Sequence, residues 1–226
     1  MNLQILDPLL ILVLLLNFAI LASGSLRVII FTVAAQGFVL AALYPIAHDN
    51  GHLAPDDAEQ LLDVARLYGL TIVMGAVKGI VVPWLLLKAM READVPHQID
   101  PIGGLTPTLI LGAIGTALAI IFSKYLTSHE VLPSGMVVPT ALATVFIGFL
   151  LLSLRREVLT QVVGYLVLEN GIFIFGLLLV TAIPIMVEIG VLLDLFVGIF
   201  VMAIVVNHVS RALPSASTEH LTTLRE

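Results

Sequence analysis

The 226-residue sequence has no cysteine, a single tryptophan and few charged residues. Without cysteine, the chain forms no disulfides and holds no iron–sulfur cluster through thiolates. Charged residues make up 12% of the chain, whereas soluble domains carry about a quarter. Hydrophobic residues make up 59%, and the mean hydropathy is +1.11. This composition excludes a soluble globular protein, and the net charge of −6 lies mostly in connecting segments.

Seven hydrophobic runs are each long enough to cross a membrane as a helix. They lie at 5–23, 28–47, 64–88, 105–125, 136–153, 157–181 and 184–209. The first run looks slightly like a signal peptide. However, an acidic residue, Asp7, precedes it and no basic residue does, so we interpret it as a retained first helix. The sequence predicts an all-α integral membrane protein, with one seven-helix domain at 1–211 and a polar cytoplasmic tail at 212–226.

The basic residues predict the orientation of these helices. An odd number of spans places the termini on opposite sides, and Lys and Arg gather on the cytoplasmic side. One side carries only Arg66 and Lys124 in this prediction. The other side carries Arg27, Lys88, Arg91, Arg155, Arg156, Arg211 and Arg225. We therefore expect an external N-terminus and a cytoplasmic C-terminus.

The acidic stretch HDNGHLAPDDAEQLLD at 48–63 faces outward in this topology. A solvated loop is the favoured interpretation, and a metal site is the alternative. The residues that imitate such a site are His48, Asp49, His52, Asp56 and Asp57. Their spacing matches no established pattern of ligands, so no metal site is predicted.

Two spans begin alike, which suggests a duplication. SLRVIIFTVAAQGFVL begins at Ser25 and SLRREVLTQVVGYLVL begins at Ser153, and each is the middle of three consecutive spans. Spans one to three and five to seven would then be parallel repeats joined by span four, with Lys78 and Asp194 at equivalent positions. Repeat interfaces often hold functional polar groups near the membrane midplane. Chance similarity between apolar helices is the alternative.

Three ionisable residues lie deep inside the predicted spans: Lys78, Glu169 and Asp194. Each is about 15–21 Å from a helix end, near the middle of a core about 30 Å thick. Each costs about 2.5–3.5 kcal/mol to insert, and such residues mark ion or proton routes. Burial disfavours the charged forms of carboxyl and lysine side chains, so these groups can load and release a proton. A proton relay is the favoured interpretation.

A static ion pair is the alternative, in which Lys78 neutralises Glu169 or Asp194 and locks helices together. For Glu188, about one turn inside the seventh span and nearer water, static pairing is favoured. His208 is expected to cap its helix, and a proton exit is the alternative. Side-chain amides within the spans are interpreted as groups that hold helices together through interhelical hydrogen bonds. They are Asn17, Gln36 and Asn170.

The stretch RREVLTQVVGYLVLENGIFIFGLLL at 155–179 resembles the middle helix of subunit K of respiratory complex I and of the small C subunit of Mrp-type cation/proton antiporters. In that superfamily two arginines are followed eight residues later by a glycine, and six residues further on by an asparagine. Arg156, Gly164 and Asn170 reproduce these intervals. The part similar to subunit K extends over 136–210.

The next helix of the superfamily carries an acidic residue four before a glycine, and Asp194 and Gly198 fit. Subunit K has its first key glutamate at the position of Leu166, whereas this chain has Glu169 three residues later. Three residues are nearly one helical turn, so the role is carried to Glu169. Over the whole chain the sequence looks most like component E of hydrogenase-4, most strongly over 153–210.

This resemblance implies a membrane-arm subunit of a respiratory-type redox complex in a bacterial inner membrane. Such a subunit has no catalytic site and no cofactor of its own. The implied partners are antiporter-like subunits, a membrane component of the complex I H type, and a hydrogenase or dehydrogenase arm; no nucleic acid is expected. Glu169, Asp194, Lys78 and Glu188 would serve proton translocation. Supporting polar residues would be Asn170, Arg155, Arg156 and His208.

Three other interpretations stay open on the sequence alone. A purely structural subunit would use its buried charges only to assemble the complex. A subunit of an Mrp-like antiporter would lack a redox arm. An autonomous secondary transporter is disfavoured, because the spans show few Gly or Pro breaks of the kind that discontinuous helices need.

Overall fold

The computed structural model describes residues 3–48, 58–92, 104–128, 135–155 and 157–179, together with Gly190 and Phe196. All elements in these described ranges are helices. The predicted seventh span lies almost entirely outside them, and so do the tail and four residues singled out above. These four are Arg156, Glu188, Asp194 and His208.

The described helices follow the predicted spans closely. They are α1 (Leu3–Ala22), α2 (Leu26–His48), α3 (Ala58–Ala76), the π-helical η1 (Val77–Val81), α4 (Val82–Glu92), α5 (Leu105–Ser128), α6 (Val137–Leu154), α7 (Val158–Gly176) and the short 3₁₀ helix η2 (Leu177–Leu179). Five helical segments are long and apolar enough to cross a membrane, and α1 contributes a shorter apolar helix at Leu6–Ala22. The chain is therefore a helical membrane protein, while the count of seven spans and the duplication remain predictions.

Two details differ from the sequence-based expectation. The acidic stretch 48–63 is not a loop throughout, because α3 begins at Ala58. The residues AEQLLD are mostly good helix formers and extend the apolar helix that follows them. The third span is also not a uniform α-helix, since η1 interrupts it between α3 and α4.

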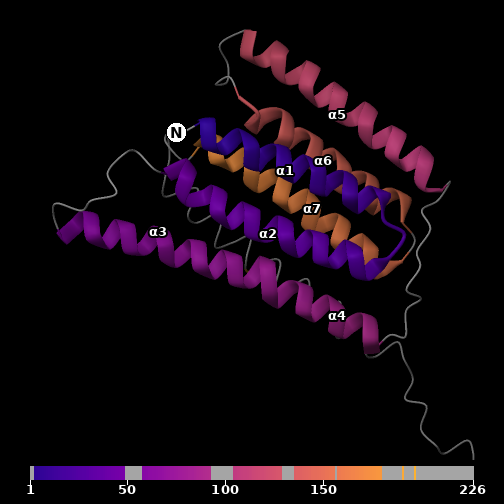
Figure 1. The fold of residues 1–226 in the computed structure, drawn as a ribbon, viewed down its shortest axis with the longest axis horizontal. Helices are drawn as coiled ribbons and strands as arrows, with labels where there is room; N and C mark the ends of the chain where they lie inside the picture. The colour runs from indigo at the N-terminus through magenta and orange to yellow at the C-terminus, as the bar shows by residue number, and fades with distance from the viewer. Residues whose placement is uncertain are drawn as a thin grey trace, which may run out of the picture.

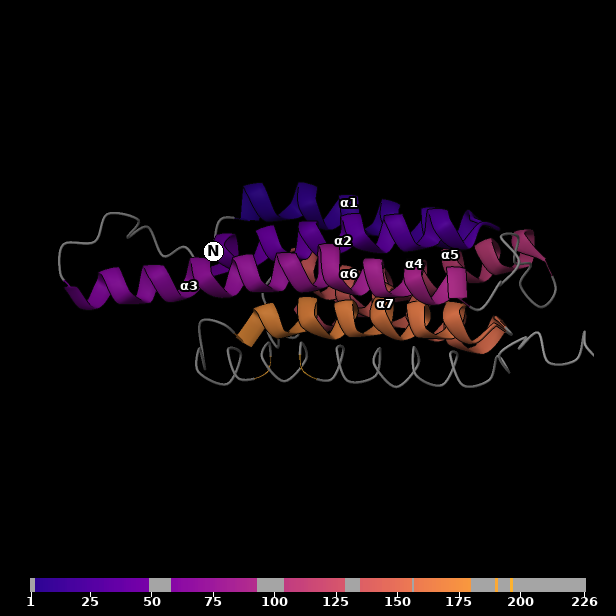
Figure 2. The same cartoon turned by 90° about the horizontal axis from the view of Figure 1, so that it is seen from below.

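The helices form a layered bundle. In Figure 1, α5 lies along one edge and the rod of α3, η1 and α4 along the opposite edge, with α1, α2, α6 and α7 between them. The antiparallel helices α6 and α7 make the most extensive contact, and α5 packs on α6 and α1. Helix α2 contacts α1, α7 and the rod. Figure 2 shows α1 and α7 at opposite faces of the bundle.

The apolar core is divided into two clusters. One cluster gathers around Ile29, Leu86 and Val163. The other gathers around Leu10 and Tyr44, towards the opposite end of the same helices. Five segments, α1, α2, α6, α7 and the rod, each contribute to both clusters. A band between the clusters is therefore left for other side chains, and polar residues fill it.

Candidate functional site

The band between the two apolar clusters is a layer of buried polar side chains, which we call the polar layer. Each helix that contributes to both clusters places its polar residue between them. The layer consists of Asn17 on α1, Gln36 on α2, Lys78 on η1, Thr144 on α6, and Glu169 and Asn170 on α7. Each of these residues is at most 8% exposed. Because apolar residues flank the layer on both sides, its polar atoms have mainly one another as partners.

The charged centre of the layer is an ion pair between η1 and α7. The Lys78 Nζ lies 3.0 Å from Glu169 Oε1 and donates a hydrogen bond to Asn170 Oδ1 at 3.2 Å. The ring of Phe173 lies one turn further along α7, with its centroid 5.6 Å from the same nitrogen. One ammonium group is therefore surrounded by a carboxylate, an amide carbonyl and the face of an aromatic ring, which are all favourable to a cation.

A line of amides continues from this centre across the bundle. Asn170 Nδ2 donates to Gln36 Oε1 at 3.3 Å, and Gln36 Nε2 donates to Asn17 Oδ1 at 3.0 Å. Asn17 Nδ2 donates to Thr144 Oγ1 at 2.8 Å. Five hydrogen-bonding side chains from η1, α7, α2, α1 and α6 thus form one continuous chain.

The backbone around Lys78 is shaped to place its side chain. Lys78 lies in the π-helical turn η1, and single π turns inside α-helices occur frequently at functional sites. Helix α2 comes very close at this point: a Cβ atom on Gly37 would lie 2.9 Å from the Lys78 carbonyl carbon and oxygen. A residue larger than glycine at position 37 would push η1 away from the layer.

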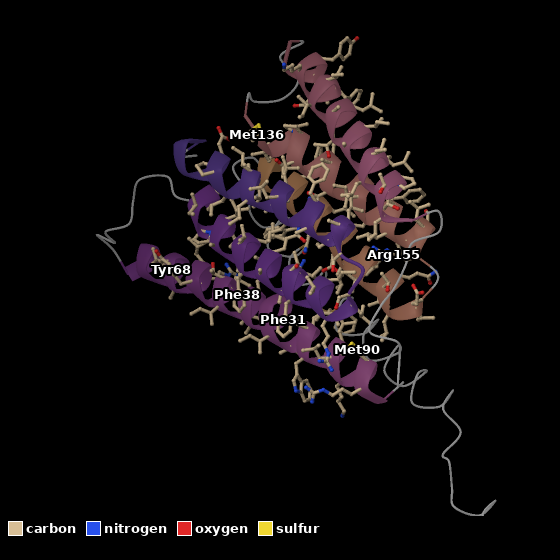
Figure 3. All side chains as sticks on the ribbon, turned by 45° about the vertical axis from the view of Figure 1, so that its right-hand side comes forward. Phe31, Phe38, Tyr68, Met90, Met136 and Arg155 are labelled. Atoms are coloured by element: carbon tan, nitrogen blue, oxygen red, sulfur yellow. The ribbon has the colours of Figure 1, made fainter. Side chains whose placement is uncertain are left out.

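A second buried cation lies at one end of the bundle. Arg155 is 1% exposed, and its Nη2 donates to the Ser23 carbonyl oxygen at 3.0 Å. Figure 3 shows Arg155 at the end of the bundle opposite Met136. Gln161 Nε2 donates to the Arg155 carbonyl oxygen at 3.1 Å. Arg155 therefore ties the turn between α6 and α7 to the turn between α1 and α2. By contrast, Arg27, its counterpart in the predicted duplication, is exposed.

Several residues singled out in the sequence therefore meet in space. Lys78 lies beside Glu169 and Asn170, and the amides of Asn17 and Gln36 join the same layer. Sequence reasoning missed Thr144, because threonine is common in membrane helices. One signal was present in the sequence, since Thr144 lies near the centre of the predicted span 136–153, but its contact with Asn17 becomes visible only once the neighbouring helices are placed.

The described part of the chain holds no group of three or more His, Cys, Asp or Glu side chains arranged to bind a metal ion. Most of the acidic stretch 48–63 lies outside that part, so the interpretation of its His and Asp residues stays a prediction. The polar layer contains one carboxylate, one ammonium, three amides and a hydroxyl. Such a set suits the holding and transfer of a proton better than the binding of a divalent cation.

Fold and site together define a helical membrane protein with a buried, charged polar layer at mid-span. The uncharacterized protein Rv0085 of Mycobacterium tuberculosis is 28% identical over 203 residues, which cover 89% of this chain and 87% of that protein. Hydrogenase-4 component E of Escherichia coli K12 is 26% identical over 152 residues, which cover 66% of this chain and 68% of that protein. The protein of the same description from Shigella flexneri matches equally.

No protein-family model and no solved structure matches this chain. The similarity to hydrogenase-4 component E is distant, and it agrees with the resemblance that the sequence motifs predict.

Proposed function

We propose that this protein is a membrane-arm subunit of a respiratory-type redox complex similar to hydrogenase-4. In this proposal its polar layer takes part in coupled proton translocation and links the redox arm to antiporter-like subunits. The similarity to hydrogenase-4 component E supports membership of such a complex. The observation that carries the coupling role is the buried ion pair of Lys78 and Glu169, 3.0 Å apart at the middle of two membrane-spanning segments.

The pair offers a simple way to couple charge to protonation. Two unit charges about 4 Å apart attract by about 4 kcal/mol at an effective dielectric constant of 20. A proton that arrives at the Glu169 carboxylate removes most of this attraction, and the charge of Lys78 then acts on its other neighbours. About 1.4 kcal/mol changes an equilibrium tenfold. The change in electrostatic free energy on one protonation event is therefore large enough to alter the equilibrium of the neighbouring group.

The remaining members of the proposed relay are Asp194 and Glu188 of the predicted seventh span. Asp194 would extend the charged centre along the midplane, and Glu188 would lie nearer the external surface. Arg155, Arg156 and His208 would support the cytoplasmic end, with the N-terminus external. Redox chemistry in other subunits would change the charge next to this row of buried ionisable residues. The resulting change in charge would pass from one residue to the next along the row.

The test is the variant Glu169→Gln, introduced into the complete complex and purified from its own membranes. Proton translocation is measured in sealed vesicles at matched subunit content, with Glu157→Gln as the control. Both carboxyls belong to the same stretch of chain, but Glu157 precedes the first turn of α7 and lies outside the polar layer. We expect normal assembly of both variants and loss of translocation only in Glu169→Gln.

Full translocation by an assembled Glu169→Gln complex would contradict the coupling role. Loss of assembly in Glu169→Gln and not in Glu157→Gln would favour a purely structural subunit, in which the pair only fastens helices. A third outcome concerns the Mrp-like alternative. Proton flux that depends on a sodium gradient, in vesicles given no redox substrate, would place the protein in an antiporter without a redox arm.

A further inference from the structure

The orientation of the amide line is fixed at its far end by Thr144. The Thr144 hydroxyl has one proton, and it donates that proton to the Thr140 carbonyl oxygen at 2.7 Å. Since a carbonyl oxygen only accepts hydrogen bonds, the Thr144 oxygen is left as an acceptor towards its other neighbour. Asn17, 2.8 Å away, must therefore turn its NH₂ group towards Thr144.

Each amide then determines the orientation of the next one. With its NH₂ on Thr144, Asn17 presents its carbonyl to Gln36. Gln36 in turn must present its NH₂ to Asn17 and its carbonyl to Asn170. Asn170 donates its NH₂ to Gln36, which leaves its carbonyl oxygen facing Lys78. All four side-chain hydrogen bonds of the line run in one direction, away from Lys78.

The lysine end requires the same direction. An ammonium group has three donors and no acceptor, so only the carbonyl oxygen of Asn170 can face a charged Lys78. If the line were reversed, Asn170 would direct its NH₂ at the ammonium, and Thr144 would have to give up its bond to Thr140. The hydroxyl on α6 and the ammonium on η1 therefore demand one and the same arrangement.

We infer that Thr144 is a positioning residue for Lys78. Acting through Asn17, Gln36 and Asn170, its hydroxyl holds the Asn170 carbonyl oxygen towards the ammonium and so keeps Lys78 in place as a hydrogen-bond donor beside Glu169. No contact between Thr144 and Lys78 is needed, because four hydrogen bonds that all run in the same direction connect the two residues.

The first experiment compares Thr144→Val, Thr144→Ser and Thr116→Val in the assembled complex. Thr116 on α5 is a matched control, because its hydroxyl also bonds the carbonyl four residues earlier, that of Gly112, at 2.9 Å, yet it lies outside the line. We expect Thr144→Val to lower proton translocation several-fold, Thr144→Ser to restore it, and Thr116→Val to leave it unchanged. Equal translocation by the Val and Ser variants would overturn the inference.

If Thr144→Val does not assemble, Thr144→Ala and Thr144→Ser form a second pair, because these two residues differ only in the hydroxyl group. We expect lower translocation in Thr144→Ala than in Thr144→Ser, and equal translocation by these two variants would overturn the inference. Since this readout rests on the proposed role of Lys78 and Glu169 in translocation, a second experiment tests the inference without it.

The second experiment is a double-mutant cycle of Thr144→Val and Lys78→Met, read as melting temperatures of the full-length chain in lipid nanodiscs. Each single variant removes one of the two groups that favour the same direction of the amides, whereas the double variant removes both, so the second substitution has less order left to disturb. The stability changes caused by substitutions within one hydrogen-bond network are not additive. We expect the melting temperature of the double variant to fall by about 2–4 °C less than the sum of the two single falls. Additive shifts would overturn the inference, even if Glu169→Gln abolishes translocation.

Discussion

The polar layer and the α6–α7 interface hold helices together by opposite means. In the layer, five segments meet through an ion pair and four hydrogen bonds between side chains. Along the α6–α7 interface, glycines allow the two backbones to touch. A Cβ on Gly171 would lie 2.6 Å from the Val145 nitrogen, and one on Gly164 would lie 2.8 Å from the Leu152 nitrogen. A Cβ on Gly148 would collide with the backbone of Leu168.

The difference separates stability from function. Small residues that let backbones approach are a general device of helix packing in membranes, and such an interface contains nothing that a proton can act on. The polar layer joins its helices through groups that respond to protonation. Changes in the α6–α7 interface should therefore alter how much folded protein exists, and changes in the layer should alter what the folded protein does.

The largest expected effect comes from Lys78→Met. Removal of one partner of a buried ion pair costs about 3–5 kcal/mol, and Asn170 Oδ1 also loses its donor. We expect a large fall in melting temperature and no proton translocation. The double variant Lys78→Met/Glu169→Gln should regain most of the stability and none of the translocation. Recovery of translocation in the double variant would contradict the idea that the polar layer determines function separately from stability.

The next effect is that of Gly164→Ala, at a point of the α6–α7 interface more than one turn from the polar layer. The added methyl group would force α6 and α7 apart, and overpacking of this kind costs about 1–3 kcal/mol. Translocation per assembled complex should stay at the wild-type level. Gly176→Ala is the control, because it lies on the same helix and no atom of the described residues lies within 4 Å of its added Cβ. It should be neutral or slightly stabilising in a thermal melt.

Gly37→Ala combines both kinds of change, since a steric substitution at this position displaces Lys78. The new methyl group would lie 2.9 Å from the Lys78 backbone, so η1 must shift away from α2. We expect a cost of about 1–2 kcal/mol, together with a reduced translocation rate. Gly69→Ala on α3, where a Cβ meets no atom within 4 Å in the part of the chain that the structure describes, should leave translocation unchanged. Equal translocation by the two variants would show that the layer tolerates displacement of η1.

The smallest effect is expected from Asp7→Asn at the rim of the bundle. Asp7 Oδ1 accepts the Met136 backbone N–H at 3.2 Å, and asparagine retains that acceptor oxygen. Its stability should change by less than about 0.5 kcal/mol, whereas Asp7→Ala should lose about 1 kcal/mol. Thermal melts of the two variants side by side make the measurement. If both variants lose the same amount, the charge of Asp7 and not its hydrogen bond holds the two helix ends together.

Hydropathy alone predicted the described helices to within a few residues, apart from the early start of α3 at Ala58, because the length of an apolar run is a direct consequence of membrane thickness. It also identified Lys78 and Glu169, since a charge inside such a run is costly and therefore conspicuous. It left open whether Lys78 faces Glu169 or Asp194, because that choice depends on how each helix is rotated. The same dependence hid Thr144, and hydropathy does not distinguish the π turn at Lys78 from a regular α-helix.

The surroundings of Lys78 act as a solvation shell built from protein. A lysine in water is stabilised by dipoles that reorient freely, whereas here a carboxylate, an oriented amide and the face of Phe173 hold fixed positions around the ammonium. Fixed dipoles do not have to rearrange when a charge appears beside them. In the proposed relay, the free-energy barrier to moving charge past Lys78 would therefore be set largely when the chain folds.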